Sequence, residues 1–391
     1  MPAATDYAYI ASGQLHLVRH GEARVVASPF AEEVVERHRK QEESDAWKAG
    51  SSWGGDPMFG MMGFAPPPTV MPTVRSLDLS PEAMCYVVRT QHSSVLLRQQ
   101  LADGYEQRLY HKQQFVGGDA AMNPAAGDDR VILSVADRET QTAHLAIVGN
   151  DHGGLKFVTD GDCIDEAASW VIDDGGKCDS IVYQSAGIGR DADGVFWALG
   201  PRRVEKLNLE NGELDTLLDH DAYDYLMPRL FADDTLWTVR RPWRSREQAS
   251  GWETGKAAVM APWHFTKAVY TIATGLASLM KQEPPKRAGG PTAPEIPPAL
   301  MLYGQLVATP KQQSHAMADD PPTAPSDWQL IKYDANDNET TVANGVVSYD
   351  VTPAGDCIYT DGHSIHRVSA DGDKTLLHQA ALVDCVRLLP G

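Results

Sequence analysis

The chain has 391 residues, of which 42% are hydrophobic, enough to form a substantial core. Its 33 Gly and 25 Pro make it rich in turns, which favours many short strands over long helices. The formal charge of −19 argues against nucleic-acid binding and against an anionic membrane surface, because both kinds of binding depend on Lys and Arg.

The cysteines and the N-terminal residues bear on the cellular compartment. The five cysteines include no CxxC pair. Cys163 lies in an expected loop, and four others lie in or beside expected strands: Cys85, Cys178, Cys357 and Cys385. This pattern predicts reduced thiols in a cytoplasmic protein, not a disulfide framework. The stretch 1–13 has no basic region and no long apolar region of a secretion signal, in agreement with that location.

Three short strands are expected near the N-terminus, in "YAYIAS", "QLHLVRH" and "EARVVAS" (7–28). An insertion, 29–71, follows and opens with a charged helix. Ser28 is the expected N-cap of this helix and Pro29 its first residue. The apolar stripe of this helix is thin and consists of Phe30, Val34 and Val35. We therefore expect the helix to pack only lightly on the rest of the protein.

The second part of this insertion, "SSWGGDPMFGMMGFAPPP" (51–68), mixes Met and aromatic residues with Gly and Pro. No regular element is expected there. The segment either packs over the protein's own surface or binds a partner protein, since Met side chains adapt to different ligands. The candidate partner-binding residues are Trp53, Met58, Phe59, Met61, Met62 and Phe64.

Two kinds of turn then recur along the chain. Short Pro/Asp/Gly turns join a first strand to a second, as in "DLSPEAMCYVV" (78–88) and "DVTPAGDCIYT" (350–360). Gly/Asp/Asn turns join a third strand to a fourth, as in "LADGYEQRL" (101–109). Together they predict five units of four strands: 72–117, 118–161, 162–221, 222–346 and 347–380.

The fourth unit contains a second insertion, 244–325, with an amphipathic helix expected over 261–281 and Pro-rich linkers after it. The helix could pack on the protein itself or dock on another protein. It could also lie on a membrane surface, although its polar face is poor in Lys and Arg, which disfavours this. No transmembrane span is expected. The basic patch "RRPWRSR" (240–246) precedes the insertion. It either binds an acidic partner or neutralises nearby carboxylates, with Arg241, Trp243 and Arg244 as the candidate binding residues.

The last segment, "VDCVRLL" (383–389), is one strand without a returning partner. The strands of 7–28 form a unit that lacks its first strand, and the C-terminal strand can supply it. The sequence thus predicts an all-β, six-bladed β-propeller over 1–391, closed by strands from both chain ends and carrying helical insertions on its top face.

The turns "SPE", "TPAGD" and "DADG" resemble the Ser/Thr-Pro-Asp-Gly turn of TolB-like and WD-repeat-like six-bladed propellers. The resemblance covers most of the chain except 29–71 and 244–325. It implies the fold and says little of function. Because the sequence has no Trp-Asp or Gly-His repeats, the WD40 family proper is disfavoured.

Both insertions, and a smaller extension at 186–201, are expected on one face of the ring. No nucleophile elbow, HExxH, zinc-type spacing or phosphate loop occurs, so no catalytic residue, cofactor or metal ligand is predicted. Calcium binding near Asp191 and Asp193 is left open. The sequence therefore predicts a non-catalytic interaction scaffold for a protein partner. The alternative is a propeller hydrolase or lyase, or a small-ligand binder, with its site at the mouth of the central channel, because such sites leave no local motif.

Overall fold

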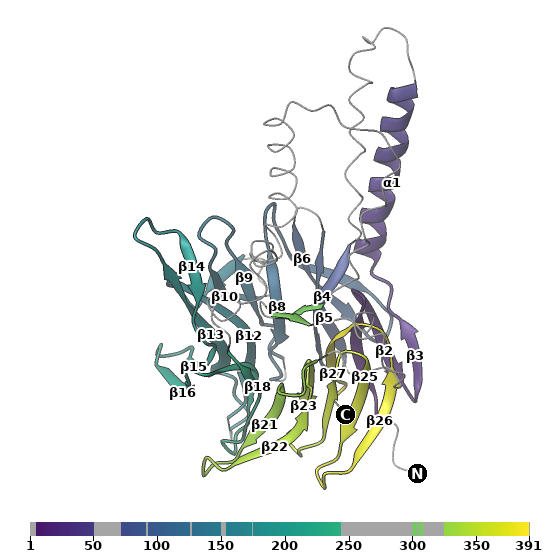
Figure 1. Cartoon of the computed structure of the whole chain (residues 1–391). Helices are drawn as coiled ribbons and strands as arrows, with labels where there is room; N and C mark the ends of the chain where they lie inside the picture. Colours follow the sequence, from purple (N-terminus) through teal and green to yellow (C-terminus); the bar gives the residue numbers. More distant parts are fainter. Residues whose placement is uncertain are drawn as a thin grey trace, which may run out of the picture.

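The computed structural model describes residues 5–50, 72–90, 93–125, 127–149, 154–173, 175–243, 300–302, 305–307 and 324–390, with backbone alone for 45–50, 300–302 and 305–307. The described residues are mostly β-strands, as expected from the turn-rich sequence, with one long helix, α1 (Figure 1). The strands form sheets of four antiparallel strands and one larger sheet.

The last strand of the chain joins the first three. β27 (Val383–Leu388) pairs with β1 (Tyr7–Ala11), and the sheet continues through β2 (Gln14–Arg19) and β3 (Glu22–Val25). The antiparallel register places Tyr7 opposite Leu388 and Tyr9 opposite Val386. The tight turn from β1 to β2 contains Gly13 at φ 76°, a conformation that favours glycine. The C-terminal strand thus has its partner at the N-terminus.

Three further sheets coincide with expected units, each in sequential strand order. The first contains β4 (Thr73–Leu79), β5 (Ala83–Arg89), β6 (Ser94–Gln100) and β7 (Glu106–His111). The second contains β17 (Tyr223–Leu230), β18 (Leu236–Pro242), β21 (Gln329–Tyr333) and β22 (Glu339–Asn344). The third contains β23 (Ser348–Val351), β24 (Cys357–Thr360), β25 (Ser364–Val368) and β26 (Lys374–Gln379). A short hairpin of β19 (Leu300–Leu302) and β20 (Gln305–Val307) is separate from them.

The expected units 118–161 and 162–221 are not separate sheets, which corrects the prediction. They form one nine-stranded sheet, because β10 and β12 run parallel to each other at the pair Ala143–Ile164. A bulge between Glu166 and Ser169, with Ala167 at φ 51°, bends β12 so that only its first residues lie beside β10. The strands of this sheet are β8 (Gly117–Met122), β9 (Val131–Ala136), β10 (Ala143–Val148), β11 (Leu155–Phe157), β12 (Cys163–Val171), β13 (Ser180–Arg190), β14 (Phe196–Leu199), β15 (Arg203–Asn208) and β16 (Leu214–Leu218).

The hydrophobic core lies between neighbouring groups of strands. Each cluster of buried residues takes side chains from two adjacent groups, which is how propeller blades pack face to face. Residues from two adjacent groups that belong to the same cluster are, in order around the molecule, Ile10 and Leu77, Val87 and Leu133, Ile132 and Ile181, Val204 and Leu236, Val239 and Tyr359, and Ile358 and Val386.

The helix α1 (Pro29–Gly50) begins where the sequence predicted. The Oγ of Ser28 accepts a hydrogen bond from the Ala31 amide at 3.3 Å, as an N-cap does. Glu106 on β7 holds this end in place, because its carboxylate accepts hydrogen bonds from Ser28 Oγ (2.7 Å) and from the Phe30 amide (2.9 Å). Phe30 and Val34 are buried against the sheets, whereas residues 39–44 are all exposed, so the helix projects away from the sheets (Figure 1).

Candidate functional site

Most of the partner-binding residues expected from the sequence lie outside the described part of the chain: Trp53, Met58, Phe59, Met61, Met62, Phe64 and Arg244. Their role stays a prediction, as does that of the segment 261–281. Trp243 is described and half-buried, and its amide donates a hydrogen bond to the Ala222 carbonyl at 2.9 Å.

Arg241, on β18, has an internal position. Its side chain is 1% exposed, and its Nε lies 2.9 Å from Oδ2 of Asp224 on the paired strand β17. The guanidinium carbon lies 4.8 Å from the centre of the Trp328 ring. The other carboxylate oxygen of Asp224 accepts a hydrogen bond from the Arg202 amide, so the pair joins β17 and β18 to the segment before β15. Arg241 thus pairs with a carboxylate of its own sheet, and the partner-binding role expected for the basic patch stays a prediction.

A cluster of four charged side chains lies on the first strands of four sheets: Asp78 on β4, Arg229 on β17, Asp350 on β23 and Arg387 on β27. Arg229 lies 3.6 Å from Asp350, and Arg387 lies 3.8 Å from Asp78. We call these four residues the inner-strand charge cluster. Burial raises the pKa of Asp78, while Arg229 and Arg387 act in the opposite direction. With two acids and two bases, the cluster is close to neutral when all are ionised.

The two acids of this cluster also join neighbouring sheets by the same pair of hydrogen bonds. Ser76 Oγ and Asp78 Oδ2 accept from the amides of Ala120 and Met122 on β8. Ser348 Oγ and Asp350 Oδ2 accept in the same way, from the amides of Val386 and Leu388 on β27. A repeated Ser-x-Asp on a first strand thus connects it to the first strand of the next sheet. The Ser-x-Asp repeat is visible in the sequence, in "SLDLSPE" and "SYDVTPAGD". The prediction from the sequence rested only on the turns that follow it, "SPE" and "TPAGD".

Asp384 on β27 is a second ionisable group near the inner strands. Burial, with a smaller contribution from Asp119, raises its pKa to about 7 against the effect of Arg75. Among the described residues, its Oδ1 is buried and has no hydrogen-bond partner. A carboxyl group with such a pKa could act as an acid or a base at neutral pH, and sequence reasoning had not singled it out.

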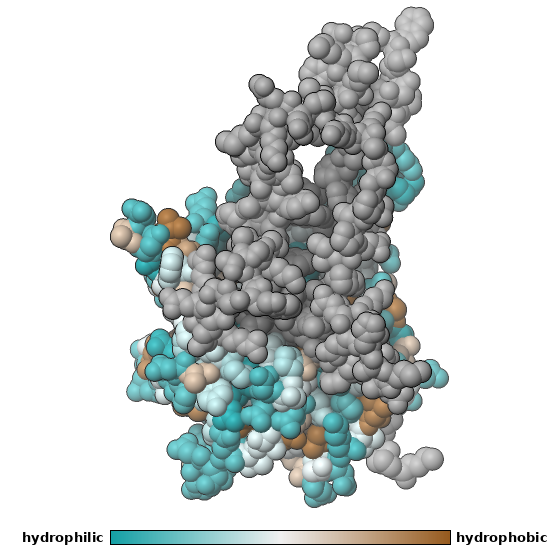
Figure 2. Space-filling model, viewed as in Figure 1, coloured by the Kyte–Doolittle hydropathy of each residue, from teal (hydrophilic) through white to brown (hydrophobic). Residues whose placement is uncertain are grey.

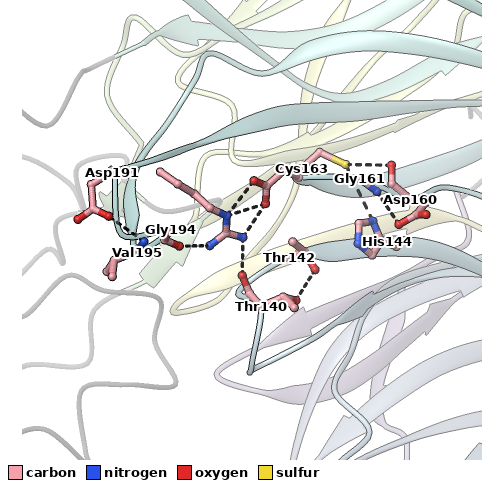
Figure 3. Close-up of polar contacts among 11 residues, drawn as sticks. Thr140, Thr142, His144, Asp160, Gly161, Cys163, Asp191, Gly194 and Val195 are labelled. Atoms are coloured by element: carbon pink, nitrogen blue, oxygen red, sulfur yellow. Dashed lines mark hydrogen bonds and ion pairs between the residues drawn. The ribbon is translucent and has the colours of Figure 1, made fainter.

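One further cluster, of His144, Cys163 and Asp165, contains three donor types that metals bind, within 4.8 Å of one another. Figure 3 shows two of its members, His144 and Cys163. Burial and the neighbouring carboxylates raise the pKa of the Cys163 thiol to about 12. A catalytic cysteine needs a lowered pKa, so this thiol is not an activated nucleophile. The other four cysteines are buried, and all five are free of disulfides.

The visible surface of the described residues is mostly hydrophilic, with isolated hydrophobic side chains among polar ones (Figure 2). Within the described ranges, no helix is long and apolar enough to cross a membrane.

No protein-family model and no curated protein matches the sequence. Among solved structures, TolB from Acinetobacter baumannii is 11% identical with a TM-score of 0.51, and the match covers 99% of this chain and 67% of TolB. A chain of a nidogen/laminin complex is 8% identical with a TM-score of 0.51, and the match covers 99% of both chains. At such low identity these likenesses concern the fold alone: the chain is a β-propeller that resembles TolB.

Proposed function

We propose that this protein is a non-catalytic scaffold that presents one side of a β-propeller to a protein partner. The observation that carries this proposal is α1, which leaves the sheets after its first two turns. Its exposed part is held as a helix by ion pairs along its own surface, Arg37 with Glu33 and Arg39 with Glu36 and Glu43. A helix that packs so little on the other described residues is available to contact another protein.

The long connections support this proposal by their placement. α1 and the hairpin of β13 and β14 project on the same side of the sheets (Figure 1). The connections at the opposite ends are short, such as Ser80–Glu82 between β4 and β5 and Ser369–Asp373 between β25 and β26. Loops that carry function are disproportionately the long ones displayed by a rigid scaffold.

We further propose that the strands form six blades in a closed ring. The six seams of buried residues support this count, since the nine-stranded sheet contains one seam within itself. Neighbouring first strands are also in contact, from β27 to β4, β8, β12 and β17, and Arg229 then connects β17 with β23. In this proposal, the pairing of β27 with β1 closes the ring of blades. The five free cysteines support a cytoplasmic location.

Affinity capture followed by mass spectrometry, with the intact protein as bait, tests the scaffold role. One variant lacks 51–66, and a second exchanges the charges of an exposed ion pair, Arg37→Glu with Glu33→Arg. The exchange keeps an ion pair at these two positions of the helix but reverses the sign of the charge at each position. The control is Asp371→Lys, in the short turn at the opposite end. We expect the control to recover the same partner as the intact protein and both variants to lose it. Equal recovery by all four baits would refute the proposal.

A second candidate function, a small-ligand or catalytic site on the inner strands, is favoured by Asp384 alone. Its raised pKa, and a buried oxygen with no hydrogen-bond partner among the described residues, are typical of functional carboxyl groups. The neutrality of the inner-strand charge cluster argues for a structural role of that cluster. A thermal-shift screen of small amines and polyols against the intact protein and Asp384→Asn distinguishes the two functions. A ligand of Asp384 would raise the melting temperature of the intact protein but not that of the variant.

A further inference from the structure

The junction within the nine-stranded sheet places together residues that are distant in the sequence. Since β10 and β12 run parallel at Ala143–Ile164, His144 lies beside the start of β12. Cys163 and Asp165 are the first and third residues of β12, so their side chains are on the same face of the strand. The parallel pairing of β10 and β12, which joins two expected blades into one sheet, thus brings these three residues together.

The donor atoms of the three side chains are close to the spacing of a metal site. Cys163 Sγ lies 3.3 Å from Asp165 Oδ2. It lies 3.9 Å from His144 Nδ1, and Figure 3 shows these two residues. The third separation, between His144 and Asp165, is within 4.8 Å. Bonds of about 2.0–2.3 Å to a tetrahedral Zn²⁺ put neighbouring donors roughly 3.3–3.8 Å apart. The Cys163–Asp165 separation falls within that range, and the Cys163–His144 separation lies just above it.

The burial of Asp165 points independently to a ligand. Its side chain is 2% exposed, and its Oδ1 has no hydrogen-bond partner among the residues that the structure describes. A buried carboxylate oxygen without a partner is costly, and an ion is one of the few groups that satisfy it. Cys163 and His144 are only half-buried, so a cation from solvent has access to the cluster.

We propose that His144, Cys163 and Asp165 form a binding site for a divalent cation of the zinc class. One nitrogen, one sulfur and one oxygen donor suit a borderline-soft metal such as Zn²⁺ or Co²⁺. They do not suit Ca²⁺ or Mg²⁺, which take oxygen ligands almost exclusively. Three protein ligands leave a fourth position for water. The main-chain oxygen of Asp160 lies 3.8 Å from Cys163 Sγ.

The surrounding contacts hold the two strands in place without using the donor atoms. Arg190, at the end of β13, contacts both carboxylate oxygens of Asp162 through its Nε at 2.8 Å. The same side chain donates a hydrogen bond to the Thr140 carbonyl at 2.8 Å, just before β10 (Figure 3). Arg190 therefore bridges the residues that precede His144 and those that precede Cys163. Asp162 is committed to this bridge and is not a ligand of the site.

Metal binding at this site exchanges a proton for a metal bond. In the metal-free protein the Cys163 thiol is placed to donate its proton to Asp165 Oδ2. When the cation binds, the S–H bond breaks, the proton leaves to solvent and the sulfur bonds to the metal as a thiolate. Neither oxidation nor reduction is involved. Binding should therefore weaken as the pH falls.

Titration of the metal-free full-length chain with Co²⁺ tests the site, because a cobalt–thiolate bond gives a charge-transfer band in the near ultraviolet. All five cysteines lie in the described residues, so the band reports on one of them. The variants are Cys163→Ser, His144→Gln and Asp165→Asn, and the matched control is Cys178→Ser, which removes a thiol outside the cluster. Circular dichroism establishes that each variant is folded.

We expect one Co²⁺ per chain with a thiolate band, displaced by Zn²⁺. Cys163→Ser should abolish the band, the other two variants should weaken binding at least about tenfold, and Cys178→Ser should bind as the unmodified chain does. Zn²⁺ should also raise the melting temperature of the control but not that of Cys163→Ser. Absence of the band in the unmodified chain, or its survival in Cys163→Ser, would overturn the proposal.

Discussion

Deletion of residues 382–391 removes the strand that completes the N-terminal sheet. β27 pairs with β1 from Tyr7 to Ala11, and its Val386 and Leu388 amides donate further hydrogen bonds to Ser348 and Asp350 of the neighbouring sheet. The deletion therefore exposes the edge of β1 and opens the contacts of β27 with β4 and with β23. An unpaired apolar edge of this kind promotes aggregation.

The loss of stability can be bounded from the burial of β27. Val383 and Val386 are fully buried, and Leu388 is 9% exposed. Burial of three such side chains contributes about 1.5–3 kcal/mol each, roughly 5–9 kcal/mol altogether as an upper bound. The net stability of a typical protein is only about 5–15 kcal/mol. We therefore expect the truncated chain to be insoluble or largely unfolded at 25 °C.

Thermal and urea unfolding, followed by circular dichroism, measure this effect, with solubility after expression as a first readout. The matched control lacks only residues 390–391, which follow β27, and should unfold as the full-length chain does. A soluble 382–391 deletion that melts within about two degrees of the full-length chain would refute the reasoning, because such a shift corresponds to only one or two kcal/mol.

Three further predictions concern buried polar groups. Asp78→Ala and Asp350→Ala should each lower the free energy of unfolding, measured in urea, by about 1–3 kcal/mol, because each leaves a main-chain amide without its acceptor. Asn at either position should restore most of the loss. A neutral effect of Ala would contradict the role of these residues in joining neighbouring sheets. Arg241→Ala should cost about 3–5 kcal/mol in the same assay, since it leaves the buried Asp224 without its ion pair; a loss below about 1 kcal/mol would show that the pair is not buried in solution. The pKa of Asp384 is raised to about 7, so the folded protein binds a proton that the unfolded chain loses near pH 4. Stability should thus fall as the pH rises from about 4 to 7, and Asp384→Asn should remove this part of the slope; identical pH profiles of the two proteins would contradict it.

The strands and the helix start were predictable because their signals are local. Alternating apolar residues and Gly/Asp turns specified the sheets, and Ser28 with Pro29 specified the first turn of α1. The parallel junction of β10 and β12 was not predictable, because the bend in β12 occurs at Ala167, a residue type with no preference for positive φ.

The candidate sites depended on register, which the sequence pattern does not specify by itself. Arg241 and Trp243 have the composition of a binding surface, yet Arg241 stands opposite Asp224 across a strand pair and is buried with it. His144 and Cys163 are nineteen residues apart and meet only because two strands run parallel, so no zinc-type spacing exists. The Ser-x-Asp repeat, in contrast, could have been recognised from Ser76 and Ser348.

Cross-linking mass spectrometry of the captured complex, with a lysine-reactive reagent, tests the central claim most directly, namely that a partner contacts the side from which α1 projects. Lys40 lies on the exposed part of α1, and Lys374 begins β26 after the short turn at the opposite end. We expect partner cross-links at Lys40 and none at Lys374. Cross-links at Lys374 without any at Lys40 would contradict it.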